Sequence, residues 1–150
     1  MTGELVIGRV EAGDLGSVRI LANARLREGY TIELFQHLFE SQPGCFLTAK
    51  EDDELMGFLV GVPVNGTSLR ILMIAVKSTM TRRGIGSMLM GSAERYAFLR
   101  KMTSIVLEVG IGNKDAIGFY NHLGYQMTEL ITEYYKDRSD AFKMRKYLSM

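Results

Sequence analysis

The chain has 150 residues, of which 47% are hydrophobic, and this supplies enough apolar side chains for one domain, expected over residues 1–150. Its net charge of +1, with both signs mixed, gives no support for nucleic-acid binding through a broad basic face, so we expect no nucleic-acid partner. No segment reaches the roughly 20 apolar residues of a membrane span and no signal peptide is recognisable, so we expect a cytoplasmic protein without a membrane partner.

The first third of the chain predicts a strand followed by two helices. Residues 5–10 have the pattern of a strand, and Asp14 is placed to cap a helix that ends near Arg25. Thr31 is placed to cap a second helix, which ends before Pro43.

A hairpin and a further strand are predicted next. Residues 45–50 and 55–63 form the two hairpin strands, and the acidic residues 51–54 connect them. The Asn-Gly pair at 65–66 predicts a tight turn. It leads into an apolar strand that ends at 71–76, so four strands precede the middle of the chain.

Two glycines then open a helix. Gly84 and Gly86 precede apolar positions that recur at helical spacing through residue 97. Glycine permits a close backbone approach, and the N–H groups of a first helical turn attract anions such as a diphosphate. Alone the pattern is weak evidence for a phosphate site, because two glycines are also common where a loop simply leads into a helix. The Lys-Ser/Thr ending of a P-loop and the three-glycine dinucleotide fingerprint are both missing.

The next strand and helix follow in one unbroken register. Apolar residues alternate with Glu108 over residues 105–109, which predicts a strand with the Glu108 side chain facing away from its apolar neighbours. Asn113 is a suitable N-cap, Tyr120 lies on the apolar face of the helix, and Gly124 stands where a C-terminal glycine belongs.

Two more strands, over residues 125–134 and 141–148, complete the predicted architecture. The fold class is therefore α/β, with a mixed sheet of about seven strands and helices on both faces. Six methionines in apolar patterns are predicted to fill gaps in the core: Met73, Met88, Met90, Met102, Met127 and Met144.

Cysteine and histidine exclude other chemistry. A single cysteine permits no internal disulfide, and Cys45 fits a buried strand residue better than a nucleophile. His37 and His122 stand on different predicted helices without partners at metal-site spacing, so we expect surface or half-buried roles and no metal.

The glycine loop and the segment after it resemble the GNAT acetyltransferases. The resemblance rests on Gly84 and Gly86, on Leu-Glu-Val at 107–109, and on Asn113 and Tyr120. Within that family the pattern is similar to the bacterial ribosomal-protein alanine N-acetyltransferases. Two further segments resemble protein N-terminal acetyltransferases of the NatA type: Leu26 to Tyr30, and Tyr134-Tyr135 with Asp140-Ala141 and Met144.

The resemblance implies a role for each of these segments, with acetyl-CoA as the cosubstrate and no metal. Glu108 would be the base, directly or through water, and Tyr120 the acid near the sulfur. The residues implied to bind acetyl-CoA are Ile74, Ala75 and Val76 by their backbone, Arg82, Arg83, Gly84, Ile85, Gly86 and Ser87 at the diphosphate, and Asn113. A groove for the first residues of a protein N-terminus or nascent chain would contain Glu28, Tyr30, Tyr134 and Tyr135.

Several alternatives remain at this point. Thr81 and Gly110 depart from the family pattern. Glu108 could be a solvent-facing strand carboxylate, Asn113 only a cap, and Tyr120 only a core residue. The rival functions are a small-amine acetyltransferase, for a polyamine or amino sugar, and a non-catalytic acyl-CoA-binding module. The sequence leaves open whether the ribosome or an auxiliary subunit is a partner.

Overall fold

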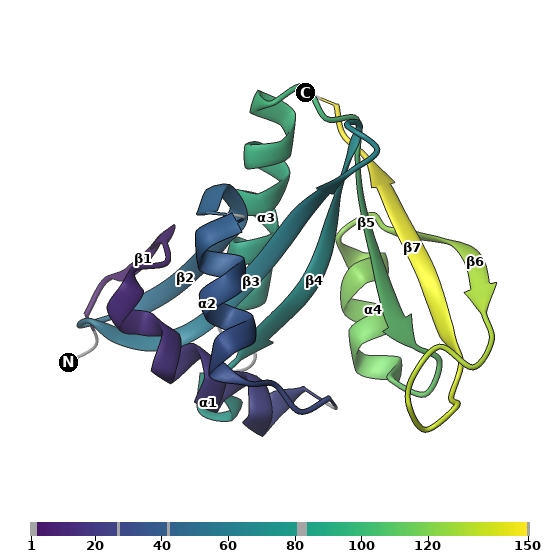
Figure 1. The fold of residues 1–150 in the computed structure, drawn as a ribbon. Coiled ribbons are helices and arrows are strands. Elements are labelled where there is room, and N and C mark those ends of the chain that lie inside the picture. The colour runs from purple at the N-terminus through teal and green to yellow at the C-terminus, as the bar shows by residue number, and fades with distance from the viewer. Residues whose placement is uncertain (1–2, 27, 42, 81–83, 150) are drawn as a thin grey trace. The chain divides into compact units, whose positions relative to one another are not determined.

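In a computed structural model of the protein, residues 3–26, 28–41, 43–80 and 84–149 are described (Figure 1). They contain the predicted mixed sheet of seven strands, and its strand order is β1-β2-β3-β4-β5-β7-β6. The chain divides into two compact units. The first unit comprises Met1–Val62 and Leu72–Tyr96, and the second unit comprises Pro63–Ile71 and Ala97–Met150. Strands β3 and β4 contribute residues to both units.

The elements follow the predicted order along the chain. Their bounds are β1 Leu5–Arg9, α1 Leu15–Arg25, α2 Ile32–Ser41, β2 Phe46–Glu51, β3 Glu54–Val64, β4 Ser68–Val76, α3 Ile85–Leu99, β5 Ser104–Gly110, α4 Lys114–His122, β6 Gln126–Ile131 and β7 Ala141–Tyr147. Short 3-10 turns occupy Ala12–Asp14, Pro43–Cys45 and Ser78–Met80.

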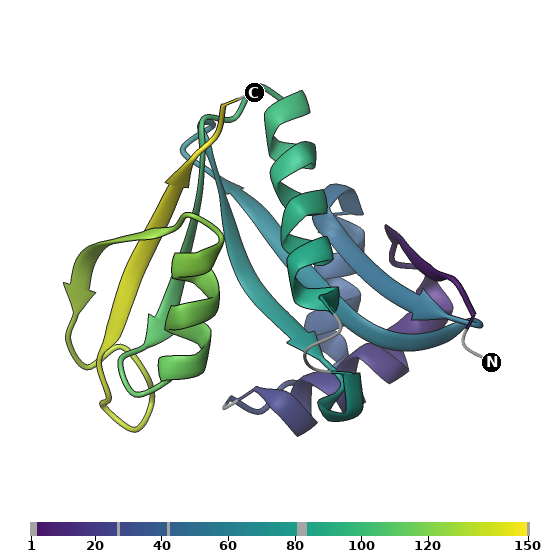
Figure 2. The ribbon, with the colours of Figure 1, turned by 180° about the vertical axis from the view of Figure 1, so that it is seen from behind.

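The first unit is layered, with α1 and α2 on one face of its strands and α3 on the other (Figures 1 and 2). Phe35 of α2 packs against Phe46 of β2 and Phe58 of β3, with ring centroids 6.4 and 6.1 Å away. On the opposite face, a Cβ atom added at Gly57 would lie 3.0 Å from the carbonyl oxygen of Ala75 and 3.3 Å from Ile85. Gly57 therefore allows α3 to pack closely on β3.

The two predicted helix caps differ in outcome. The Thr31 hydroxyl accepts a hydrogen bond from the N–H of Leu34 at 3.3 Å, which confirms it as the cap of α2. Asp14 stands at the N-cap position of α1 but makes no side-chain cap bond. Its carboxylate instead accepts the N–H of Glu11 at 2.8 Å and lies 2.9 Å from Nζ of Lys50.

The β2–β3 connection is tighter than predicted. Asp52 and Asp53 have φ values of 53° and 64°, so two residues make the turn and both strands extend into the predicted loop. Positive φ at both central residues matches the twist of a hairpin. The predicted turn at Asn65 and Gly66 is confirmed, with φ values of 54° and 70°.

In the second unit, β5 is the central strand. It pairs in parallel with β4 from Ser68 opposite Ser104 to Ile71 opposite Leu107, and antiparallel with β7. Strand β6 stands at the end of the strand order and pairs with β7. Helix α4 covers one face of these strands (Figure 2). There the buried Tyr120 ring packs against Tyr125 with centroids 5.8 Å apart.

The last predicted hairpin has shorter strands than expected. Strand β6 ends at Ile131 because Glu133 adopts a φ of 52° and donates its N–H to Oδ1 of Asp140 at 2.9 Å. Tyr134 and Tyr135 therefore lie in the β6–β7 loop and not in a strand. The hairpin pairing itself is confirmed.

Some predicted burial was wrong. Met88 and Met127 are 43% and 56% exposed, whereas Met73, Met90 and Met144 are buried in the core as predicted. Cys45 is buried, but it ends the turn before β2 and is not in the strand. His37 and His122 are exposed, in agreement with the predicted surface roles.

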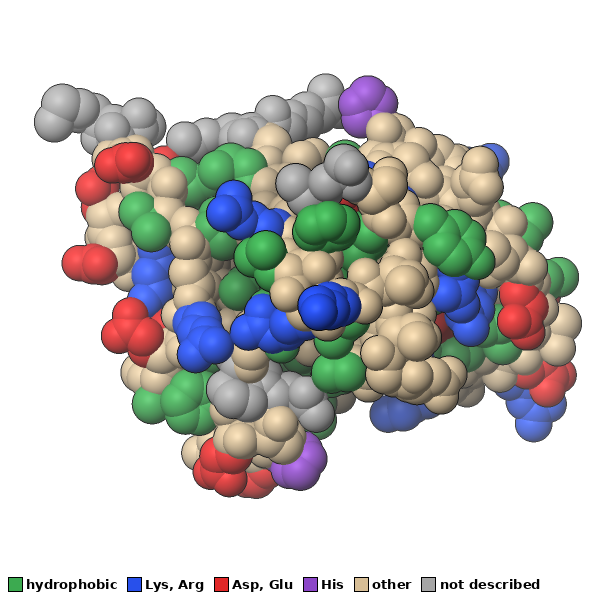
Figure 3. Space-filling model, turned by 90° about the horizontal axis from the view of Figure 1, so that it is seen from above, with side chains coloured by type: hydrophobic (Ala, Val, Ile, Leu, Met, Phe, Trp, Pro, Cys, Tyr) green, Lys and Arg blue, Asp and Glu red, His purple; other side chains and the backbone are tan. Residues whose placement is uncertain are grey.

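No helix within the described ranges is long and apolar enough to cross a membrane. On the face shown in Figure 3, Lys and Arg side chains lie among hydrophobic and uncharged ones, and acidic side chains lie toward the edges.

Candidate active site

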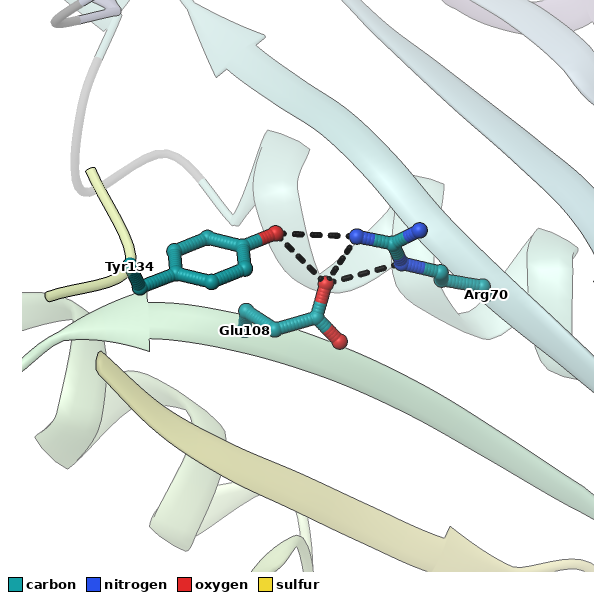
Figure 4. Close-up of polar contacts among 3 residues, drawn as sticks. All are labelled: Arg70, Glu108 and Tyr134. Atoms are coloured by element: carbon teal, nitrogen blue, oxygen red, sulfur yellow. Dashed lines mark hydrogen bonds and ion pairs between the residues drawn. The ribbon is translucent and has the colours of Figure 1, made fainter. Parts of the chain in front are cut away.

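Glu108 is held in a polar cluster of the second unit (Figure 4). Its side chain is only 10% exposed. Oε1 of Glu108 accepts hydrogen bonds from Nε of Arg70 at 2.8 Å and from the hydroxyl of Tyr134 at 3.0 Å, and it also pairs with Nη2 of Arg70. The alternative that Glu108 is a solvent-facing carboxylate is therefore wrong.

Strand geometry explains how these three residues meet. Arg70 on β4 is the register partner of Val106, two residues before Glu108 on β5. Residues two apart on a strand share a face, so Arg70 reaches Glu108 along that face. Tyr134 comes from the β6–β7 loop, where its N–H donates to the carbonyl oxygen of Ser139 at 3.0 Å.

The charges within the cluster are matched. Burial alone would lower the pKa of Arg70, but the hydrogen bond and the negative charge of Glu108 outweigh burial and raise this pKa. Burial and the Glu108 charge raise the pKa of Tyr134, and Arg70 partly offsets the rise. Tyr134 is therefore a neutral phenol at physiological pH, and it donates a hydrogen bond to Glu108.

Tyr120 lies on α4 in the second unit. Its side chain is buried against Phe119 and Tyr125. Burial, with a smaller contribution from Tyr135, raises the pKa of Tyr120. The packing prediction for this residue is confirmed, and its hydroxyl stays protonated at physiological pH.

Asn113 is the N-cap of α4, as predicted. Its Oδ1 accepts the N–H of Ala116 at 3.2 Å. The residue is exposed, and its contact with a cofactor stays a prediction.

In the first unit, the predicted diphosphate loop leads into α3. Gly84 has a φ of 78° and its carbonyl oxygen accepts the N–H of Met88 at 3.0 Å. The N–H groups of Ile85, Gly86 and Ser87 thus belong to the first turn, where a helix has no internal partners for them. This donor set suits an anion such as the diphosphate of acetyl-CoA.

The other residues predicted to bind acetyl-CoA lie in α3 and at the end of β4. The Ile85 side chain is buried in the core, so only its backbone is available to a ligand. Ile74, Ala75 and Val76 end β4, with Ala75 buried. Thr81, Arg82 and Arg83 lie outside the described residues.

The predicted peptide groove draws on both units. In the first unit, Glu28 and Tyr30 lie between α1 and α2, and Asn23 accepts the Tyr30 N–H at 2.7 Å and donates to its carbonyl oxygen at 2.9 Å. In the second unit, the rings of Tyr134 and Tyr135 meet edge to face with centroids 4.9 Å apart. The groove that these four residues would form together stays a prediction.

A comparison with family models decides what kind of protein this is. The model of the acetyltransferase (GNAT) family matches residues 16–125. The chain belongs to this family. As a GNAT acetyltransferase it is an N-acetyltransferase that uses acetyl-CoA as the acetyl donor.

Individual relatives agree. An uncharacterized N-acetyltransferase of Methanocaldococcus jannaschii is 31% identical over 95% of this chain and 91% of its own length. An N-alpha-acetyltransferase of Sulfurisphaera tokodaii is 24% identical over 87% of this chain and 86% of its own length. The crystal structure of Ard1 from Thermoplasma volcanium has a TM-score of 0.94 and 32% identity, covering 97% of this GNAT chain and 99% of that chain.

The sequence interpretation did not single out Arg70 or Asn23. Neighbouring residues in the sequence do not indicate the partners of an arginine near the start of a strand or of an asparagine inside a helix. The partner of Arg70 follows from the strand register, and that of Asn23 from the packing of the loop. Within the described ranges, no group of three or more His, Cys, Asp and Glu side chains could hold a metal ion. A pocket of about 310 Å³ in the first unit, beside α1, contains none of the predicted site residues.

Proposed function

We propose that this GNAT enzyme acetylates the α-amine of protein N-termini, those of ribosomal proteins among them, with Glu108 as the base and Tyr120 as the acid. The observation that supports this acceptor best is the charge around Glu108. A site for a polyamine needs a surplus of carboxylates, because its substrate carries several positive charges.

Among the described residues of the second unit that neighbour Glu108 on β4, β6 and β7, the charges are balanced. Arg70 forms an ion pair with Glu108. Lys143 on β7 is the register partner of Glu108, and Glu129 on β6 is in turn opposite Lys143. Two cations therefore accompany two carboxylates, which disfavours a polycation and suits an amine that loses its single charge before it attacks.

The energy of deprotonation favours the same acceptor. At pH 7, removal of a proton costs about 1.4 kcal/mol for an α-amine with a pKa near 8, but about 4.6 kcal/mol for a lysine side chain. A single carboxylate that is already paired with Arg70 therefore needs about 3 kcal/mol less to deprotonate an α-amine than to deprotonate a lysine side chain.

The chemical step follows from these side chains. When bound, acetyl-CoA supplies an activated acetyl group and a thiolate leaving group. The α-ammonium first loses a proton to Glu108, directly or through water, and Glu108 passes this proton to solvent. The neutral nitrogen then bonds to the acetyl carbon, Glu108 takes the second proton from that nitrogen, and the electrons of the breaking carbon–sulfur bond leave with sulfur as a thiolate. Tyr120 is the acid: its hydroxyl donates a hydrogen bond to that sulfur as charge develops and then protonates the thiolate, and Tyr120 regains a proton from water. This transfer from a phenol of pKa above 10 to a thiolate of pKa near 8.5 costs at least about 2 kcal/mol.

The similar proteins support this proposal. The relative from Sulfurisphaera tokodaii is named an N-alpha-acetyltransferase. The resemblance of Leu26–Tyr30 and of the tyrosine loop to N-terminal acetyltransferases supports the same acceptor class.

The test is release of free thiol from acetyl-CoA with a panel of acceptors. Short peptides beginning with Ser, Ala, Thr, Gly or Met are compared with Nα-blocked lysine peptides and spermidine. We expect turnover with the free α-amines alone. Turnover with spermidine or blocked lysine peptides alone would contradict the proposal, and binding of acetyl-CoA without turnover on any amine would point to a binding module.

A further inference from the structure

Arg70 contacts both other members of the Glu108 cluster through different nitrogens. Nε donates to Oε1 of Glu108 at 2.8 Å, and Nη2 donates to the Tyr134 hydroxyl at 2.9 Å. Every contact drawn to the Glu108 carboxylate in Figure 4 ends on the same oxygen, while the other oxygen points away from Arg70 and Tyr134.

The directions of these hydrogen bonds are fixed. An arginine can only donate, so the Tyr134 oxygen accepts from Nη2. The Tyr134 hydrogen is then left for Oε1 of Glu108, 3.0 Å away. Two hydrogen bonds and the ion pair with Nη2 therefore converge on Oε1. Among the contacts of the described residues, none is made by Oε2, so its lone pairs are the ones that can take up a proton.

We propose that Arg70 is a positioning residue for acetyl transfer, which holds Oε1 of Glu108 and the Tyr134 hydroxyl so that Oε2 of Glu108 faces the acceptor amine. This inference rests on the proposed role of Glu108 as the base. Because Tyr134 belongs to the β6–β7 loop, its hydrogen bonds with Arg70 and Glu108 also fix this part of the loop beside the carboxylate.

The planar fork of Arg70 matters as well as its charge. A carboxylate that is 10% exposed needs a cation nearby to offset its desolvation. A lysine at position 70 would supply the charge, but an ammonium group lacks the rigid fork that reaches two partners at once. The effect of Arg70→Lys therefore separates orientation from charge.

The experiment measures kcat and KM by thiol release for Arg70→Lys, Arg70→Gln and Glu108→Gln, with whichever amine the unaltered enzyme acetylates fastest. We expect kcat to fall by roughly 10-fold for Arg70→Lys and roughly 100-fold for Arg70→Gln, with KM for both substrates little changed, since removal of a positioning contact costs on this order. Arg145→Gln is the matched control.

Arg145 serves as the control because its guanidinium lies on the same sheet face but bonds to Ser68 and Ser104 instead of Glu108. Its replacement is expected to lower stability and leave kcat unchanged. A loss of kcat in Arg70→Gln that Arg145→Gln reproduces at equal stability would overturn the inference.

Chemical rescue provides a second readout that a purely structural role would not move. Added methylguanidinium should restore several-fold activity to Arg70→Ala but none to Glu108→Gln, and methylammonium at the same ionic strength should restore less. Equal rescue by the two cations would reduce the role of Arg70 to charge and overturn the inference.

The two proposals fail in different ways. Unchanged kcat in Arg70→Gln, with activity lost in Glu108→Gln, would refute the positioning role alone. A raised KM for the acceptor with an unchanged kcat would make Arg70 a substrate-binding residue. Unchanged kcat in Glu108→Gln would instead refute the proposed base.

Discussion

Two arginines on one sheet face have different surroundings. Arg70 on β4 and Arg145 on β7 are both register partners of Val106 on β5. Arg70 bonds to a carboxylate and a loop tyrosine. Arg145 donates from Nη1 to the hydroxyls of Ser104 at 2.6 Å and Ser68 at 3.3 Å.

Only one of the two arginine clusters contains a group that can act as a base. Ser68 and Ser104 are buried and bonded to each other at 2.8 Å, so the Arg145 cluster satisfies neutral groups within the sheet. The Arg70 cluster contains a group that can take up a proton, and one member comes from a loop. The two arginines have the same residue type and equivalent strand positions, so only their hydrogen-bond partners distinguish their roles.

The largest effect is expected for Glu108→Gln. The glutamine can keep an oxygen acceptor for Arg70 and Tyr134, yet it cannot take the amine proton, so kcat should fall about 100-fold or more. Acetyl-CoA affinity, measured by calorimetry, should stay the same. Full turnover in Glu108→Gln would show that Glu108 is not the base, and the Arg70 cluster would then have no more chemical function than the Arg145 cluster.

Tyr120→Phe tests the proposed acid on α4. Loss of a hydrogen bond to a developing thiolate should lower kcat by roughly 10- to 100-fold. Binding of acetyl-CoA should be unaffected, because the ring is retained. If turnover is complete in this variant, Tyr120 is a packing residue only.

Arg145→Gln should change stability instead of activity. Loss of the guanidinium leaves buried serine hydroxyls with one donor fewer, which costs about 1–3 kcal/mol of unfolding free energy. Urea denaturation measures this loss, and kcat of the folded variant should match the parent. A kcat lowered as far as in Arg70→Gln would show that the two arginines act alike and would overturn the positioning role of Arg70.

The smallest effect is expected at alkaline pH. Because the pKa of Tyr120 is higher in the folded state than its ordinary value near 10, stability is full below about pH 10 and falls as pH rises above it, by at most about 1.4 kcal/mol per pH unit. Denaturation of Tyr120→Phe should show a shallower decline. Tyr147→Phe, which removes an exposed hydroxyl, is the control and should keep the parent slope.

Local patterns were sufficient for most of the fold. Alternation around Glu108, the Asn113 cap and the turn at residues 65–66 each depend on neighbouring residues, and the structure confirms them. The end of β6 was missed because it depends on Asp140, which bonds to the N–H of Glu133 seven residues away. Exposure of Met127 was missed because an edge position depends on strand order.

For the candidate site, sequence indicated Glu108 and Tyr134 but not what joins them. Arg70 is 38 residues from Glu108 along the chain, and only the parallel register of β4 and β5 brings them together. The family resemblance supplied the roles of base and acid, whereas burial and the ion pair of Glu108 came from the structure.

The most direct test offers the enzyme one peptide with two competing amines: a free N-terminal alanine and an internal lysine. Fragmentation mass spectrometry of the product locates the acetyl group. We expect acetyl on the α-amine and an unmodified lysine, because the proposed base is one arginine-bound carboxylate and the α-amine is the more easily deprotonated of the two amines. Acetyl found on the lysine, with a free N-terminus, would contradict it.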